Sequence, residues 1–128
     1  MINDELIVSE RKRQNIVFDK SKKFGIRIIK LCNHLHKAKG DYVIYRQLAR
    51  SGTSIAANLA EANCAYTRAD FYAKISIAYK ECGESLCWID MAYGAGLLSD
   101  DEFVSIYTDC NDIFNILTAI SKTRDKDK

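Results

Sequence analysis

The sequence contains no proline and only six glycines among its 128 residues. Sandwiches and barrels need many tight turns, and glycine and proline form most of them. The shortage of both residues argues against an all-β fold and favours a few long helices. Hydrophobic residues make up 48% of the chain, which is enough to bury a core, and the length fits a single domain.

Signals for a membrane, for secretion and for disulfides are also missing. No uncharged run approaches the roughly 20 apolar residues that span a bilayer, and residues 1–13 lack the apolar segment of a secretory signal. The five cysteines are odd in number and include no Cys-x-x-Cys pair. These features predict a cytoplasmic protein without a membrane partner, with reduced thiols that pack mostly as small hydrophobes.

Apolar residues recur at three- and four-residue steps along four segments, which is the period of an amphipathic helix. We therefore predict an all-α fold, an antiparallel up-down-up-down four-helix bundle that forms one domain over 1–128. The helices are expected at about 16–38, 42–64, 68–93 and 100–122, with polar ends at 1–14 and 122–128. Asp41, Thr67 and Ser99 are the expected N-caps, and Ser99 with Glu102 has the capping-box spacing. The expected core includes Leu48, Ile55, Leu59, Phe71, Ile75, Leu86, Ile89, Phe103, Cys110 and Phe114.

Small residues interrupt the second predicted helix. The run Ser51-Gly52-Thr53-Ser54 has poor helix propensity. Such a run in the middle of a helix predicts either a kink or the close approach of a neighbouring helix.

The third predicted helix carries a second apolar face. On a helical wheel Ile77, Trp88 and Met91 lie opposite the core stripe, with Glu84 beside them. Aromatic residues and methionine are enriched at subunit interfaces. We therefore predict that this face joins subunits of a homo-oligomer, although scattered exposed apolar residues would give the same pattern.

Charge is unevenly distributed, although the net charge is only +2. Residues 11–50 contain twelve Lys or Arg against two acids, and residues 81–112 contain eight acids and no base. Three interpretations remain open: two solvated faces of opposite sign, a nucleic-acid footprint, or basic and acidic surfaces that meet within a subunit or between subunits. The candidate nucleic-acid-binding residues are Arg11, Lys12, Arg13, Lys22, Lys23, Arg27, Lys30 and Lys37. The acidic residues that would face them across a subunit interface are Glu81, Glu84, Asp109 and Asp112.

Patterns typical of enzymes and metal sites are absent from the sequence. The only two histidines, His34 and His36, are two positions apart and so point to opposite sides of a helix. There is no Glu-x-x-His pair, no phosphate-binding loop and no nucleophile elbow. We predict no catalytic residue, no metal site and no cofactor.

One stretch resembles a known family. Residues 50–62, together with residues 69–71 and 74–81, resemble the 23S rRNA intervening-sequence proteins, also called S23-like proteins. The family motif falls on Ser51, Gly52, Ser54, Asn58 and Glu61. The resemblance implies a small bacterial four-helix bundle that assembles as a homopentamer and has no known catalytic residues.

The resemblance also suggests partners. A related branch, the accessory variability proteins of diversity-generating retroelements, binds RNA and a reverse transcriptase. Two functions are therefore expected for the present chain. The first is RNA binding through the basic surface of the first helix. The alternative is a protein-interaction scaffold or accessory subunit, for example a partner of a reverse transcriptase, without direct contact to nucleic acid.

Overall fold

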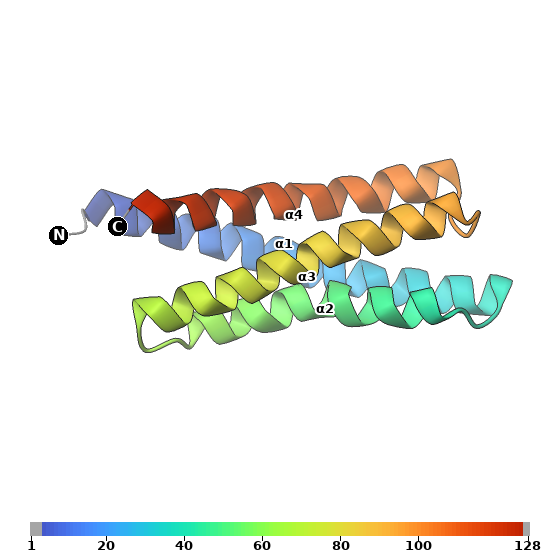
Figure 1. Cartoon of the computed structure of the whole chain (residues 1–128), viewed down its shortest axis with the longest axis horizontal. Coiled ribbons are helices and arrows are strands. Elements are labelled where there is room, and N and C mark those ends of the chain that lie inside the picture. Colours follow the sequence, from blue (N-terminus) through green and yellow to red (C-terminus); the bar gives the residue numbers. More distant parts are fainter. Residues whose placement is uncertain (1–3, 127–128) are drawn as a thin grey trace.

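The protein is described by a computed structural model, which covers the backbone of residues 4–126 and the side chains of residues 10–124. It contains α1 (Asp4–Lys39), α2 (Val43–Asn63), α3 (Arg68–Gly94) and α4 (Asp100–Lys126), and no strand within the described range. Each helix runs back along the one before it, so that both termini and the α2–α3 connection lie at one end (Figure 1). The predicted all-α four-helix bundle is confirmed. None of the helices between residues 4 and 126 offers a stretch long and apolar enough to cross a membrane.

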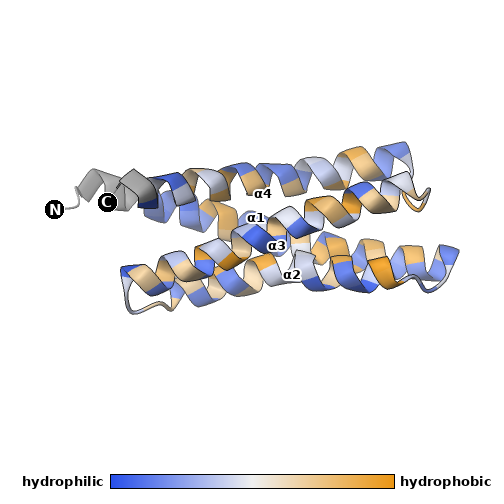
Figure 2. Ribbon diagram, in the orientation of Figure 1, coloured by the Kyte–Doolittle hydropathy of each residue, from blue (hydrophilic) through white to orange (hydrophobic). Residues whose placement is uncertain are grey.

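The core runs along the whole bundle. Hydrophobic and hydrophilic segments alternate along every helix, as amphipathic helices require (Figure 2). Most of the predicted core is buried, namely Leu48, Ile55, Leu59, Ile75, Ile89 and Cys110. The other predicted members are half-buried and pack against these, namely Phe71, Leu86, Phe103 and Phe114. The apolar periodicity therefore identified the buried face of each helix correctly, but it placed some half-buried residues at the edge of that face in the core.

The start of α3 shows such a difference. Phe71, which the sequence predicted for the core, is only half-buried, and its neighbour Tyr72 is buried instead. The Tyr72 hydroxyl donates a hydrogen bond of 2.8 Å to Glu10 Oε1, so its polar end is satisfied inside the bundle. Phe71 packs edge-on against the Tyr72 ring, with 5.1 Å between ring centroids.

The first and the last helix, α1 and α4, are longer than predicted. α1 begins at Asp4 and not near residue 16, and α4 continues to Lys126 and not to 122. The buried face of α1 continues through Glu10 and Gln14, whose polarity hides it from an apolar pattern. Thr123 extends the buried face of α4, and its hydroxyl donates to Ala119 O at 3.1 Å. Most of the two predicted polar ends is therefore helical, while residues 1–3 and 127–128 lie outside the described range.

Two of the three predicted caps are confirmed. Thr67 Oγ1 accepts from the Asp70 backbone N–H at 3.0 Å. Ser99 and Glu102 exchange both bonds of the capping box, at 2.8 and 3.1 Å. The prediction for Asp41 is wrong: Tyr42 occupies the N-cap of α2 without a side-chain bond, and Asp41 accepts from Arg46 Nη1 at 2.6 Å.

The small residues of α2 lie at close helix contacts. A Cβ atom placed on Gly52 would lie 3.1 Å from both Cγ1 and Cγ2 of Ile28 on α1. Gly25 of α1 faces the same contact, since its own Cβ would lie 3.9 Å from the Gly52 carbonyl oxygen. The close approach predicted for this run is confirmed.

Candidate nucleic-acid interface

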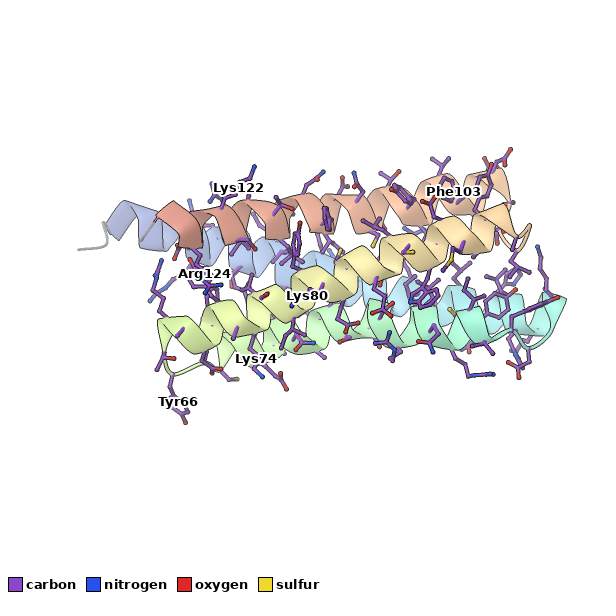
Figure 3. The ribbon with its side chains drawn as sticks, in the orientation of Figure 1. Tyr66, Lys74, Lys80, Phe103, Lys122 and Arg124 are labelled. Carbon is purple, nitrogen blue, oxygen red and sulfur yellow. The ribbon has the colours of Figure 1, made fainter. Side chains whose placement is uncertain are left out.

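Basic side chains from both ends of the sequence gather at one end of the bundle. Arg13 Nη1 on α1 donates to Thr123 Oγ1 on α4 at 3.2 Å, which places residues 11–13 beside residues 122–124. Figure 3 shows Lys122 and Arg124 in the half of the bundle that holds both termini. We call this group the terminal basic cluster, which consists of Arg11, Lys12, Arg13, Lys122 and Arg124.

The terminal basic cluster is open to solvent. Arg13 is half-buried and the other four members are exposed, and none forms an ion pair with a side chain in the range 10–124. Two carboxylates at this end are already engaged. Glu10 Oε1 accepts from Arg68 Nη2 at 3.0 Å, and Glu61 pairs with Lys74 at 3.3 Å. Among the side chains of residues 10–124, none neutralises the positive charge of the cluster.

The middle of α1 is less available than the sequence predicts. Arg27 pairs with Asp109 and also donates to Ser105 Oγ at 2.7 Å. Lys23 pairs with Asp19 at 3.1 Å. Beyond these two, Lys22 Nζ lies 4.4 Å from the centroid of the Phe18 ring, a cation–π distance. The remaining two candidates are Lys30 and Lys37, which are exposed.

Three of the four predicted acidic partners are also occupied within the chain. Arg50 on α2 pairs with both Glu81, at 3.2 Å, and Glu84 on α3. Asp109 is taken by Arg27. Asp112 borders a small cavity of about 180 Å³ that Lys20 and Lys23 also line. Part of the charge separation seen in the sequence is therefore resolved by pairs between helices of one chain, which involve Arg27 and Arg50.

Of the predicted subunit-contact residues, two present apolar surface. Ile77 and Met91 are 40% and 45% exposed. Trp88 is half-buried against the core, and its Nε1 donates to Glu84 Oε1 at 3.1 Å. A second apolar area lies on α1, where Ile26 and Ile29 are exposed one turn apart.

The family motif has structural roles. The Ser51 hydroxyl bonds the Ser85 hydroxyl on α3, and Gly52 contacts Ile28. Asn58 Nδ2 donates to the carbonyl and hydroxyl oxygens of Ser54, at 2.8 and 3.0 Å. Glu61, the last residue of the motif, lies outside the buried stripe of α2 and pairs with a lysine of α3. Each contact stays within α2 or joins it to a neighbouring helix.

The cysteines are all free thiols. Cys82 and Cys110 are buried with their sulfur atoms 3.8 Å apart, and Cys32 is also buried. Burial raises the pKa of the Cys32 thiol to about 11. The hydrogen bond with Cys82, followed by burial, raises the pKa of Cys110. Within the described part of the chain, no three His, Cys, Asp or Glu residues form a metal-binding group.

Sequence reasoning missed the α4 half of the terminal basic cluster. Lys122 and Arg124 fall in the predicted polar end, which has no apolar spacing of its own. The buried positions Ile113, Leu117 and Ile120 recur at helical spacing and lead on to Thr123, which could have shown that the helix continues.

Comparisons with known proteins agree with this architecture. A sequence profile of the family described as 23S rRNA-intervening sequence protein matches residues 13–119. A crystal structure from Bacteroides thetaiotaomicron, described as a protein of unknown function from the S23 ribosomal protein family, is 37% identical with a TM-score of 0.83. The match covers 86% of the present chain and 98% of that chain. Curated proteins give no significant match. The chain therefore belongs to the 23S rRNA-intervening sequence protein family.

Proposed function

We propose that this protein is a non-enzymatic RNA-binding protein that contacts phosphate groups through the terminal basic cluster. The observation that supports the proposal is the convergence of cations from α1 and α4 at one end of the bundle. Lys and Arg side chains that neutralise phosphates release condensed counterions, which supplies most of non-specific binding.

The proposed contact is to the RNA backbone. Arg11, Lys12, Lys122 and Arg124 are long side chains without a partner in the range 10–124 that would hold them in one orientation. Such side chains fix a nucleic acid by its phosphates and carry no direct sequence information. We therefore expect weak sequence preference and a steep dependence on salt.

A pair of charge-reversed variants tests the proposal. The two double variants are Lys12→Glu/Arg124→Glu and Lys30→Glu/Lys37→Glu. Each changes the net charge from +2 to −2, and all four positions are exposed. Binding of a fluorescent RNA oligonucleotide would be followed by anisotropy over a range of salt concentrations. The first variant should lose most of its affinity for RNA. The slope of log binding constant against log salt concentration should become less steep by about 0.7 for each phosphate of a single strand that the variant no longer neutralises.

The second variant is the matched control, because it removes the same charge from the other half of α1. It should keep most of the affinity. An equally large decrease in affinity in the two variants would mean that net charge and not the terminal basic cluster determines binding. Failure of the wild-type protein to bind any RNA at low salt would overturn the proposal and leave a protein partner, such as a reverse transcriptase, as the function to test.

We also propose that the protein is a homo-oligomer, with five subunits as the number expected from the family resemblance. Support comes from Ile77 and Met91, which expose apolar surface on the outer side of α3. Light scattering should show that Ile77→Lys/Met91→Lys dissociates the assembly with its helix content intact. Val43→Lys/Val104→Lys, at positions 62% and 61% exposed, is the matched control and should keep the wild-type mass. A monomeric wild-type protein would refute this proposal.

A further inference from the structure

A cavity of about 470 Å³ opens beside the terminal basic cluster. It lies between the N-terminal part of α1, the end of α2 and the connection to α3. Its volume falls within the range of about 300–1,000 Å³ that is usual for small-molecule sites. Polar and aromatic side chains dominate its lining, among them Arg11, Gln14, Asn15, Asn63, Tyr66 and Phe71. This composition differs from the apolar groove that a protein helix would require.

The wall of the cavity contains an unsatisfied acceptor. Gln14 is 4% exposed, and its Nε2 donates to Leu59 O at 3.3 Å and to Asn63 Oδ1 at 3.0 Å. The other end of the amide, Oε1, is buried and accepts no hydrogen bond from the part of the chain that is described. Orphaned buried acceptors are rare in folded proteins. Because the oxygen has almost no accessible surface, a donor in the cavity, such as an amino or ring N–H group, reaches it only if the Gln14 amide turns toward the cavity.

A freely exposed aromatic ring stands at the edge of the same cavity. Tyr66 lies in the α2–α3 connection and is 100% exposed. Figure 3 shows its side chain pointing away from the bundle, at the end that holds both termini. Both faces of the ring are therefore open for stacking. Phe71 provides a second ring on the cavity lining, held edge-on against Tyr72.

We propose that this cavity and Tyr66 bind one unpaired nucleotide of a single-stranded RNA. The base stacks on the Tyr66 ring, its hydrogen-bonding edge meets the exposed amides of Asn15 and Asn63, the Gln14 amide turns to accept from it, and Arg11 contacts its phosphate. Unpaired bases are recognised by this combination of an aromatic ring and polar groups. The inference rests on the proposed function, and it adds a preference for single strands that phosphate contacts alone do not give.

The test compares a single-stranded RNA with a fully paired duplex of the same length, both followed by anisotropy. Tyr66→Ala should weaken single-strand binding by about 5- to 150-fold, the range that removal of one stacking ring gives, and should leave duplex binding unchanged. Tyr66→Phe should bind like the wild type, because stacking uses the ring and not the hydroxyl. Tyr42→Ala removes another exposed tyrosine, which is 44% exposed and is the N-cap of α2. The α1–α2 connection lies at the opposite end of the bundle (Figure 1), so this variant should have no effect.

The outcomes separate the two proposals. If Tyr66→Ala affects neither RNA, or both equally, while Lys12→Glu/Arg124→Glu abolishes binding, the nucleotide site is wrong and the proposed function stands. A decrease in affinity in Tyr66→Phe as large as in Tyr66→Ala would overturn stacking as the mode of contact. Absence of wild-type binding to either RNA would overturn both.

Discussion

Ser51 on α2 and Ser85 on α3 share a buried hydrogen bond, with 2.8 Å between their hydroxyl oxygens. Both side chains are fully buried, and Ser85 also donates to Glu81 O at 2.9 Å. The next residue of α2, Gly52, contacts Ile28 on α1. Two adjacent small residues therefore bring α2 close to both of its neighbours.

The serine pair should show energetic coupling. Ser85→Ala leaves the Ser51 hydroxyl with only a marginal contact, to Leu48 O at 3.5 Å, and an unsatisfied buried group costs about 1–3 kcal/mol. Ser51→Ala/Ser85→Ala removes both hydroxyls and should cost less than the sum of the two single changes. The free energy of unfolding in urea would be measured for the wild type, the two single variants and the double variant, which together form a double-mutant cycle. Additivity within about 0.3–0.5 kcal/mol would show that the two hydroxyls act independently.

Gly83 should tolerate alanine better than Gly52 does. A Cβ on Gly52 would meet Ile28 at 3.1 Å, whereas a Cβ on Gly83 would lie 3.6 Å from Phe114 Cε2, an ordinary contact. We expect Gly83→Ala to raise the free energy of unfolding by about 0.4–1 kcal/mol through helix propensity. Gly52→Ala should gain less or be destabilising, and Gly52→Leu should cost about 1–3 kcal/mol or more by overpacking.

Chemical denaturation of the three variants provides the measurement. Equal stabilisation of Gly52→Ala and Gly83→Ala would show that the α1–α2 contact has room for a methyl group.

The capping box of α4 should make stability depend on pH. The Ser99 backbone N–H donates to Glu102 and lowers the pKa of this carboxyl from its usual 4.5. The unfolded chain therefore binds the proton at higher pH than the folded chain, so this contribution is present above pH 4.5 and is lost as the pH falls through the folded pKa. Glu102→Gln should destabilise the protein at neutral pH, and its difference from the wild type should shrink under acid conditions. Urea unfolding between about pH 7 and about pH 3 measures this difference, and a constant difference would refute the assignment.

Thiol reactivity should divide the cysteines by burial. Cys64 and Cys87 are exposed, whereas Cys32, Cys82 and Cys110 are buried. The raised pKa values of Cys32 and Cys110 keep these thiols protonated at about pH 8, and the thiolate is the reactive form. Ellman's reagent should label only the two exposed thiols in the native protein and all five in denaturant. Rapid native labelling of a third cysteine would contradict the burial of these three side chains.

Local patterns predicted much of the fold. The bounds of α2 and α3 and the caps at Thr67 and Ser99 follow from apolar spacing and from hydrogen bonds that span three residues. The early start of α1 could not be predicted in this way. Its buried face continues through Glu10, a polar residue that is stable inside the bundle because Arg68 and Tyr72, about 60 positions away, donate to it.

The candidate site was predicted only in part for the same reason. Arg11 and Lys12 stand out as a local run of charge. The pairing of Arg27 with Asp109 depends on helix packing that brings together residues 82 positions apart. Charge composition identifies how many basic side chains a segment has, and only the tertiary structure shows which of them are already paired.

The bond between Arg13 and Thr123 also has a consequence for how the protein is made. It joins residues 110 positions apart, whereas α2 and α3 are neighbours in the chain. Contacts between distant residues form late, because a long loop must first be closed. A chain still attached to the ribosome can pair α2 with α3, but it has no terminal basic cluster until residues 122–124 have been synthesised and docked. We therefore expect the complete cluster to form only late in folding, after α2 and α3 have paired.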